Sequence, residues 1–277
     1  MPQQHPFGNV LVGVDGTPTG RDAIALAHGL CAHGGRLTLA NIVLMPTPTY
    51  RNFHMTPVGR DRFEMLERER DAIGVAAELT GMFAASVGRG LHQLGLDCDA
   101  DLLVVGSSSR GPVRRVLVGD DARGTITGAS CPVAVAPHGY VEQTYEIENV
   151  GVAYDGGAEA EAALAVARQF AAAHGARLAA LTVVSPVAGA MRDVPTLQRA
   201  ARDSLRQLEG VEGRVAVGTP AGELVAFGEE LDLLVVGSRG RGPLRRLILG
   251  STSVQLAREA RCPLLIVPRP GHADASA

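Results

Sequence analysis

The sequence contains no lysine, and all 26 of its basic residues are arginine. This absence excludes chemistry that needs a lysine amine: the P-loop lysine of many nucleotide-binding proteins, a Schiff base, or a lysine general base. The motifs H-E-x-x-H and G-x-S-x-G and the Walker A sequence are also absent, and the eight histidines are scattered. The chain is therefore not expected to be a dedicated enzyme.

Other absences concern location and partners. No apolar run approaches the roughly 20 residues that span a bilayer, and MPQQHPFGN at the start does not resemble a secretory signal. The net charge of −3 lacks the positive excess that is typical of nucleic-acid binding. The four cysteines match no zinc module and indicate buried, reduced thiols. We expect a soluble cytoplasmic protein with no nucleic-acid or membrane partner.

An internal repeat organises the chain. Residues 10–43 and 150–184 share an apolar strand, an Asp-Gly pair, a helix rich in small residues and a second apolar strand. The hexapeptide D-L-L-V-V-G recurs at 101–106 and 232–237, and both copies then close with Cys-Pro and an apolar run. We predict four segments: repeat 1 over 1–138, a linker over 139–148, repeat 2 over 149–269 and a tail over 270–277.

Strands and helices are expected to alternate within each repeat. Runs such as Val10–Val14 and Leu264–Val267 are apolar on both faces, as in parallel strands that helices cover on both sides. Alanine-rich helical segments, Gly20–His33 and Glu159–His174, lie between strands. The pattern predicts two doubly wound, Rossmann-like α/β domains, each with a five-stranded, mostly parallel sheet. In such sheets ligands bind at the carboxyl ends of the strands, where the strand order reverses.

Less regular stretches give weaker predictions. Amphipathic helices are expected over Gly59–Leu79 and Met191–Leu208, and the third strands near Gly81–Val87 and Arg214–Val217. Three prolines in Met45–Val58 indicate an exposed loop.

The strongest ligand-binding pattern starts where the fourth strand of repeat 2 ends. Gly237 and Gly240 are followed, after nine intervening residues, by Gly250, which opens a helix. Glycine allows positive φ and a close approach to a ligand, and a helix start offers unpaired N–H groups to phosphate. A glycine turn before a serine-capped helix would give the same spacing without a ligand. The candidate nucleotide-binding residues of this stretch are Gly237, Ser238, Arg239, Gly240, Arg241, Gly242, Gly250, Ser251, Thr252 and Ser253.

This loop, placed after a D-L-L-V-V-G strand, resembles that of the ATP-binding branch of the universal stress protein family. Asp15 and Asp155 match the aspartate that the family places at the end of its first strand. The resemblance covers both repeats, as in tandem two-domain members. It implies a site for ATP or ADP, with Mg²⁺ held through the phosphates. It also implies that Asp155 lies beside the ribose or adenine, that Ala153 lines the base pocket, and that Val183 meets adenine through its backbone.

Repeat 1 departs from the pattern. The counterparts that the resemblance implies there, as weaker candidates, are Gly13, Asp15, Ile42, Gly106, Gly111 and Gly119. Ser109 stands in place of Gly240, and Asp120 stands in place of Ser251 and is followed by Asp121. Two unit charges about 4 Å apart repel by roughly 4 kcal/mol at an effective dielectric of 20. We predict that the site of repeat 1 is weak or empty and that Asp120 serves as a helix N-cap.

Three functions are compatible with these features. A regulatory stress protein would bind ATP and change its partner contacts or dimerisation; a slow ATPase would hydrolyse it; a scaffold would have lost the ligand. The intact loop of repeat 2 argues against the scaffold, and the lack of a base for the attacking water argues against the ATPase. The final strands, Val133–Ala136 and Leu264–Val267, are expected to be the edges where the repeats pair, because unpaired edges invite pairing. A homodimer of the whole chain would be a further step.

Overall fold

Ten strands and eight α-helices alternate along the residues that the computed structural model describes. Those residues are 6–45, 53–108, 119–142, 146–186, 193–238 and 251–268. The strands of repeat 1 are β1 (Asn9–Gly13), β2 (Arg36–Leu44), β3 (Glu78–Ala84), β4 (Leu102–Gly106) and β5 (Val133–Ala136). The strands of repeat 2 are β6 (Asn149–Ala153), β7 (Arg177–Val184), β8 (Glu212–Val217), β9 (Leu233–Gly237) and β10 (Leu264–Val267).

Helices link the consecutive strands of each repeat. Those of repeat 1 are α1 (Pro18–Leu30), α2 (Pro57–Ile73), α3 (Val87–Asp97) and α4 (Asp120–Ile126). Those of repeat 2 are α5 (Ala158–His174), α6 (Val194–Arg206), α7 (Pro220–Gly228) and α8 (Ser251–Glu259). Two short 3-10 helices are η1 (Phe53–Met55) and η2 (Tyr140–Glu142). In the part of the chain that is described, no helix is long and apolar enough to cross a membrane.

All ten strands form one sheet in the order β3-β2-β1-β4-β5-β10-β9-β6-β7-β8. Every neighbouring pair within a repeat is parallel. Each repeat therefore has the order 3-2-1-4-5, which reverses between its first and fourth strands, as in a doubly wound fold. The predicted α/β class is confirmed.

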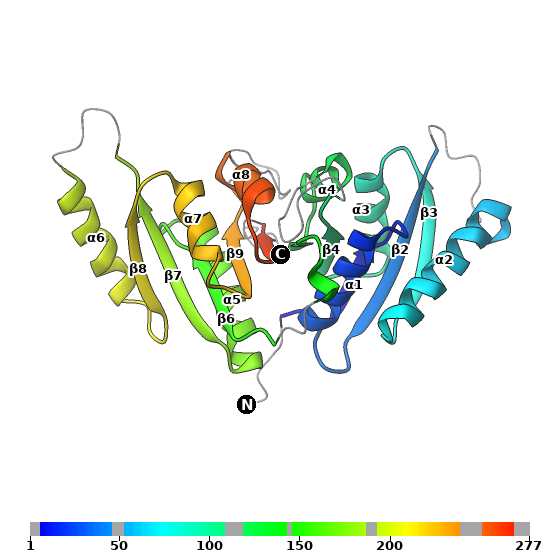
Figure 1. Ribbon diagram of the computed structural model, residues 1–277, viewed down its shortest axis with the longest axis horizontal. Coiled ribbons are helices and arrows are strands. Elements are labelled where there is room, and N and C mark those ends of the chain that lie inside the picture. The colour runs from blue at the N-terminus through cyan, green and yellow to red at the C-terminus, as the bar shows by residue number, and fades with distance from the viewer. Residues whose placement is uncertain are drawn as a thin grey trace, which may run out of the picture.

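The two repeats join through their last strands. β5 and β10 pair antiparallel, with Ala134 opposite Leu265, and this places the two halves side by side about a central seam (Figure 1). The predicted pairing of these edges is confirmed. Because each edge covers the other, neither leaves a row of unpaired backbone groups at the centre of the molecule.

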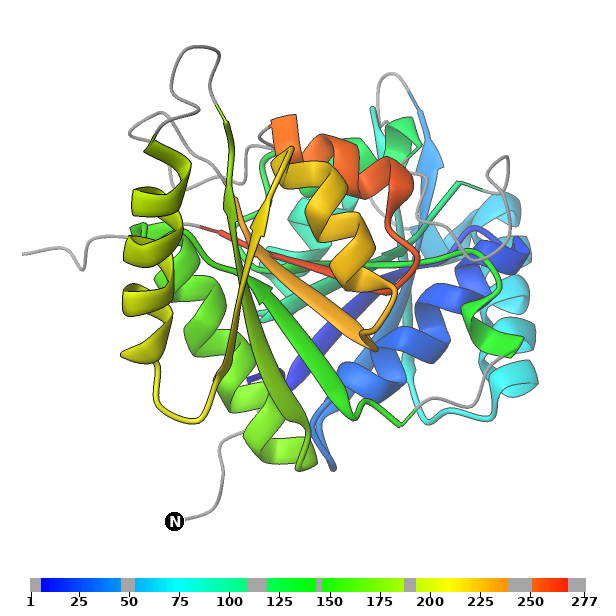
Figure 2. The same cartoon turned by 60° about the vertical axis from the view of Figure 1, so that its left-hand side comes forward.

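Helices cover both faces of the sheet, and each face has a core that runs across the seam. One core packs α1 and α2 together with α5 and α6 and includes the fully buried Leu66 and Phe170. The other core packs α3 and α4 together with α7 and α8 and includes Leu91 and Leu256. Figure 2 shows α7 and α8 lying together across one face of repeat 2. The seam is therefore held by backbone pairing and by two continuous apolar layers.

Several predicted boundaries were wrong. The helix predicted over Gly59–Leu79 ends at Ile73, because Gly74 adopts a left-handed φ of +74° and closes it. The residues after this cap extend into β3, which starts earlier than predicted, as does β8. Within the predicted exposed loop Met45–Val58, Phe53 is buried and its ring lies 5.1 Å from that of Phe83. Residues 46–52 of that loop lie outside the described part of the chain.

Helix α3 was not predicted, because its three glycines hide the helical pattern. Two of them have a packing reason. A Cβ on Gly88 would lie 2.4 Å from the carbonyl carbon of Gly124, and a Cβ on Gly90 would lie 2.7 Å from the side chain of Ile42. Glycine thus lets α3 approach both α4 and the sheet, at a cost in helix propensity.

The aspartate that opens each D-L-L-V-V-G motif has a structural role. Asp101 accepts the backbone N–H of Asn9 at 3.0 Å, and Asp232 accepts that of Asn149 at 2.8 Å. Each carboxylate thereby ties the start of the fourth strand of its repeat to the start of the first. These contacts lie at the amino ends of the strands, away from the edge where ligands are expected.

Asp22 of α1 anchors the start of the linker. Its side chain is 1% exposed, and its two oxygens accept the backbone N–H groups of Gly139 and Val141, each at 2.8 Å. Burial raises the pKa of this carboxyl, although both hydrogen bonds oppose the rise. This contact packs η2 on α1, so the first residues of the predicted linker are held against repeat 1. Residues 143–145 and the predicted tail 270–277 lie outside the described part.

The cysteines carry free thiols, as expected, but only Cys262 is fully buried. Burial raises the pKa of Cys262 to about 12 and that of Cys131 to about 11, so both remain protonated at neutral pH.

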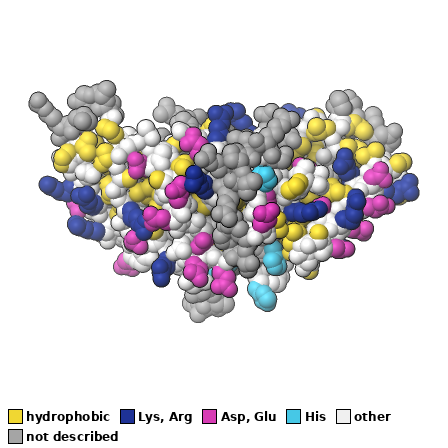
Figure 3. Space-filling view, viewed as in Figure 1, with side chains coloured by type: hydrophobic (Ala, Val, Ile, Leu, Met, Phe, Trp, Pro, Cys, Tyr) yellow, Lys and Arg dark blue, Asp and Glu magenta, His cyan; other side chains and the backbone are white. Residues whose placement is uncertain are grey.

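On the face shown in Figure 3, arginine and acidic side chains are mixed over both repeats wherever residues are described.

Candidate functional site

Two cavities lie at the carboxyl ends of the strands, one in each repeat, where the strand order reverses. The cavity of repeat 1 has a volume of about 480 Å³ and opens beside the ends of β1 and β4. The cavity of repeat 2 has a volume of about 290 Å³ and opens beside the ends of β6 and β9. Pockets for small ligands commonly enclose roughly 300–1,000 Å³, so both cavities are near or within that size.

Most of the described candidate residues of repeat 2 line its cavity. These are Ala153, Asp155, Val183, Gly237, Thr252 and Ser253. Ser238 does not line it: this residue is buried, and its N–H continues the sheet by donating to Val267 O at 2.9 Å. Ser251 is the first residue of α8. Arg239, Gly240, Arg241, Gly242 and Gly250 lie outside the described residues.

The weaker candidates of repeat 1 line the other cavity. They are Gly13, Asp15, Ile42, Gly106 and Gly119, whereas Gly111 and Ser109 lie outside the described residues. The predicted role of Asp120 as an N-cap is wrong, because Asp120 is already the first helical residue of α4. Gly119 occupies the capping position, with extended backbone and no side-chain hydrogen bond.

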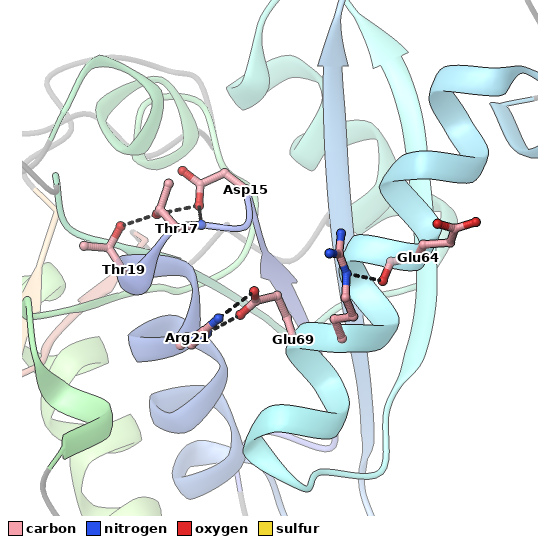
Figure 4. Close-up of polar contacts among 7 residues, drawn as sticks. Asp15, Thr17, Thr19, Arg21, Glu64 and Glu69 are labelled. Carbon is pink, nitrogen blue, oxygen red and sulfur yellow. Dashed lines mark hydrogen bonds and ion pairs between the residues drawn. The ribbon is translucent and has the colours of Figure 1, made fainter.

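An aspartate-glycine turn joins the first strand to the first helix in both repeats. Asp15 Oδ1 accepts the Thr17 N–H at 3.0 Å and the Thr17 hydroxyl at 2.7 Å, and Gly16 has a φ of +82° (Figure 4). Asp155 Oδ1 accepts the Gly157 N–H at 3.0 Å, and Gly156 has a φ of +76°. One oxygen of each aspartate therefore holds the turn, which fixes the carboxylate at the rim of its cavity.

The glycines that end β4 and β9 lie against a helix backbone, and they lack the positive φ that was predicted. Neither Gly106 nor Gly237 has a positive φ. Instead, a Cβ on Gly106 would lie 2.1 Å from the carbonyl oxygen of Thr19, and a Cβ on Gly237 would lie 2.5 Å from that of Glu159. Glycine is needed because the first turn of α1 or α5 lies directly against the strand end. That contact closes one side of each cavity.

Several lining residues were missed by sequence reasoning. In repeat 2 they are Tyr154, Glu159, Ala160, Leu181, Pro220, Leu224, Val236 and Leu256; in repeat 1 they include Asn41, Val87, Leu91 and Ser107. Asn41 and Thr182 occupy equivalent positions of β2 and β7. Thr182 is not among the described residues that line the cavity of repeat 2, so placing the repeats in register would not have found Asn41. Those on α3 and α7 could not be found either, because neither helix has a pattern that predicted it.

The first helix of each repeat is fixed by a different polar contact. In repeat 1, Arg21 of α1 forms a two-pronged ion pair with Glu69 of α2, at 2.5 Å and 3.1 Å (Figure 4). In repeat 2, the position of Arg21 is taken by Glu161, which accepts the hydroxyl of Tyr154. This hydrogen bond is the main reason that the pKa of Tyr154 rises to about 12. Tyr154 therefore stays neutral and lines the cavity beside Asp155.

Comparison with known proteins agrees with this architecture. The family model of the universal stress protein family matches residues 6–137 and 146–268. The chain belongs to the universal stress protein family. Among the described residues, no group of three or more histidine, cysteine or acidic side chains could hold a metal ion.

Individual relatives within the universal stress protein family extend this finding. A universal stress protein of Thermus aquaticus is 36% identical over 131 residues, which cover 42% of this chain and 95% of the relative. One of Mycobacterium tuberculosis is 34% identical over 182 residues, or 61% of this chain, and the match spans only 62% of that relative's length. The crystal structure of a universal stress protein from Archaeoglobus fulgidus has a TM-score of 0.69 at 19% identity, covering 95% of this chain and 99% of that one. At this identity the last comparison supports the fold alone.

Proposed function

We propose that the chain binds an adenine nucleotide, ATP or ADP, in the cavity of repeat 2 and acts as a regulatory protein of the stress response. The observation that carries this proposal is the composition of the cavity wall. Six residues that the nucleotide-binding pattern nominates, from four separate segments of repeat 2, meet around one cavity. Family membership supports the stress-response role.

The wall offers suitable chemistry for each part of a nucleotide. Leu181, Val183 and Leu224 provide an apolar surface on which a flat base can pack. Asp155, fixed by its turn, is placed to accept hydroxyl groups of a ribose. Thr252 lies in the first turn of α8, where backbone N–H groups lack intrahelical partners and favour an anion.

Two acidic residues in the wall favour a nucleotide whose charge is partly neutralised. Asp155 and Glu159 both line the cavity, and their carboxylates would repel bare phosphate oxygens. A Mg²⁺ ion held through the phosphates would offset this repulsion. We therefore expect Mg²⁺ to strengthen binding of ATP.

A nucleotide bound in this cavity would affect the contact between the two repeats at the seam. β9 forms one edge of the cavity and pairs with β10, which in turn pairs with β5 of repeat 1. α8, which contributes Thr252, belongs to the core that crosses the seam. A ligand that fixes the start of α8 would thus stabilise the contact between repeats, and this offers a route from nucleotide binding to changed partner contacts.

The substitution Ser251→Asp should abolish nucleotide binding by repeat 2. It places a carboxylate in the first turn of α8, where it repels phosphate, yet an acidic residue at a helix start does not weaken the helix. ATP at 100 times its Kd should stabilise the wild type by about 2.7 kcal/mol, seen as a rise in Tm. The variant should show no such rise, and neither ATP nor ADP should be released when it is denatured after purification.

Ser251→Asn is the matched control, because it is close in size to aspartate but uncharged. It should retain most of the ATP-dependent rise in Tm. The proposal fails if the wild type shows no rise with ATP or ADP, or if the aspartate and asparagine variants respond to ATP equally.

A further inference from the structure

Repeat 2 ends at an open strand. β8 is the last strand of the sheet, at the end opposite β3, and among the described residues it pairs with β7 alone. The N–H of Gly218, directly after β8, donates to the carbonyl oxygen of Val184 on β7. Because successive residues of a strand direct their backbone groups to opposite sides, Gly213, Val215 and Val217 direct their N–H and C=O groups away from β7. Such an edge can pair with a further strand.

Two exposed apolar side chains lie at one end of this edge. A Cβ on Gly213 would lie 2.8 Å from the Cβ of Leu205, so the last turns of α6 lie over the start of β8. Leu197 precedes Leu205 by about 12 Å along the helix, and Val217 follows Gly213 by about 13 Å along the strand. Leu197 and Val217 therefore lie at the same end. Their exposed fractions, 47% and 39%, are the largest among the large apolar side chains in the described part of repeat 2.

Repeat 1 covers the equivalent position with its own chain. Phe83 of β3 matches Val217 of β8, because the two pair with equivalent residues of β2 and β7. Phe83 is 6% exposed and packs on Phe53 of η1, with the ring centroids 5.1 Å apart. An aromatic ring thus covers this end of the strand in repeat 1, whereas the same end is exposed in repeat 2. The comparison indicates that a large apolar side chain fits beside Val217.

Arginine side chains line the outer flank of α6. Arg199, Arg202 and Arg206 follow one another at intervals of three and four residues, so they share one side of the helix. Ser204 is about 200° around the helix from both Arg202 and Arg206. Its side chain reaches the hydroxyl of Tyr154, next to β6, and by hydrogen bonding opposes the rise in the pKa of that hydroxyl. Since β6 lies on the inner side of β7, the arginines point outward, past β8, at the left-hand end of Figure 1.

The charge of this flank is opposite to that of the whole chain. α6 has three arginines and one aspartate, hence a net charge of +2, whereas the chain has −3. Arg206 pairs with Asp203 at 3.1 Å, and among the described residues neither Arg199 nor Arg202 forms an ion pair. On α2, the matching helix of repeat 1, four arginines are outnumbered by five acidic residues. The outer edge of repeat 2 therefore attracts an acidic partner, and that of repeat 1 does not.

The charged residues of β8 itself face the other side of the sheet. Arg214 pairs with Glu212 at 2.8 Å and with Glu230 at 2.7 Å. It also lies over the ring of Phe227 of α7, 5.6 Å from the centroid. These contacts hold Arg214 on the face that α7 covers. On the face that α6 covers, a strand added at this edge would meet the exposed apolar pair and the arginines.

We propose that the outer edge of repeat 2 binds an extended acidic segment of a partner protein, which pairs with β8 as a further strand of the sheet. A large apolar side chain of this segment covers Leu197 and Val217. Acidic side chains at alternate positions meet Arg199, Arg202 and Arg206, because residues two apart in a strand face the same side, about 6.6 Å from each other. This contact gives the regulatory role a partner of defined chemistry, and it does not depend on nucleotide binding in repeat 2.

The probe is a fluorescein-labelled peptide with the sequence E-T-E-T-F-T-E-T-E. It reads the same in both directions, so it tests parallel and antiparallel pairing, and its ring and carboxylates share one face when it is extended. Fluorescence anisotropy with the full chain should show saturable binding that weakens as salt is raised. The peptide with glutamine in place of glutamate should bind about fivefold more weakly or worse. The acidic peptide with methylated backbone nitrogens should not bind, because it cannot donate to β8.

Two changes in the protein test the two parts of the surface. Arg199→Gln combined with Arg202→Gln should weaken binding of the acidic peptide about fivefold, the combined effect of two exposed ion pairs. The matched control, Arg60→Gln combined with Arg62→Gln on α2, removes the same charge and should leave binding unchanged. Val215→Pro removes an N–H that points away from β7, so it should keep the sheet and abolish binding. Thermal melting checks that each variant is folded.

The proposal is overturned if the acidic peptide does not bind the wild type, if the glutamine peptide binds as tightly, or if Val215→Pro binds like the wild type. It is also overturned if the chain forms a dimer that Val215→Pro dissociates, because a second copy then occupies the edge. Binding of phosphatidylglycerol vesicles through the arginines, without binding of the peptide, would overturn it in favour of a lipid surface. The ATP-dependent rise in Tm should be the same in all these variants, and it tests nucleotide binding separately.

Discussion

Replacing Gly106 with alanine should lower the free energy of unfolding by about 3 kcal/mol, at the upper end of the usual cost of overpacking. The added Cβ would lie 2.1 Å from the carbonyl oxygen of Thr19 and 2.7 Å from its carbonyl carbon. Both are backbone atoms, so no side-chain rotation relieves the clash, and β4 must move away from α1. Urea-induced unfolding, followed by far-ultraviolet circular dichroism, measures the loss.

Gly29→Ala is the matched control, because a Cβ there meets nothing within 4 Å and Gly29 lies inside α1. This variant should be as stable as the wild type or more stable by up to about 1 kcal/mol, since alanine is the better helix former. Gly237→Ala, whose Cβ would lie 2.5 Å from Glu159 O, should resemble Gly106→Ala with a smaller loss. A Gly106→Ala protein of unchanged stability would show that the strand end is not in contact with α1.

Replacing Asp22 with alanine should cost about 2–4 kcal/mol, because two backbone N–H groups lose their acceptor at once. Among the described residues, the N–H groups of Gly139 and Val141 each donate to a carboxylate oxygen of Asp22. Their hydrogen exchange should accelerate in the variant, since η2 is no longer tied to α1. Chemical unfolding measures the change in free energy, and hydrogen exchange locates it.

Repeat 2 supplies the reason to expect that alanine itself is tolerated. Ala162 occupies the position of Asp22 in α5, so the helix accepts alanine there. Asp22→Asn keeps one acceptor and should therefore lose less stability than Asp22→Ala. Equal stability of wild type and Asp22→Ala would mean that the hydrogen bonds from Gly139 and Val141 to Asp22 contribute nothing to the free energy of unfolding.

The effect of Asp22 should also depend on pH. Its pKa lies above the usual value of 3.8, mainly because burial penalises the charged form. Stabilisation linked to this raised pKa is fully present below the unfolded value, at about pH 3.8, and is lost as the pH rises through the folded pKa. The difference in free energy of unfolding between wild type and Asp22→Ala should therefore be larger in acid than at neutral pH. Other carboxyls titrate in both proteins and cancel in this difference.

Strand positions could be predicted from the sequence because they depend on the local pattern of apolar residues. Continuous apolar runs predicted β1 to within one residue at each end and β10 to the residue, and the repeated Cys-Pro stands before the two strands that pair at the seam. Helix α3 was not readable, because its glycines are set by contacts with Gly124 and Ile42 and not by helix propensity. The helix end at Gly74 was also missed, because the early start of β3 after it was not predicted and the helix was therefore extended too far.

The site was predicted in outline and misread in detail. Topology places the ends of the first and fourth strands of a repeat together, so Asp15 was expected beside Gly106 and Asp155 beside Gly237, and each pair lines one cavity. The two glycines do not have the positive φ that was expected, and each lies against the backbone of the first helix of its repeat. Asn41, which looked like an ordinary strand residue, lines the cavity of repeat 1 and has a buried amide oxygen that has no hydrogen-bond partner among the described residues.

By itself, the sequence determined the repeat, the doubly wound order and the edge at which each cavity forms, because periodicity and the handedness of strand crossovers act on neighbouring residues. Only the tertiary structure decided which polar atoms are paired. The contact of Asp22 with Gly139 joins positions 117 residues apart, and the unpartnered oxygen of Asn41 depends on where β1, β2 and β4 meet. Such facts arise from packing between distant segments, and no local pattern encodes them.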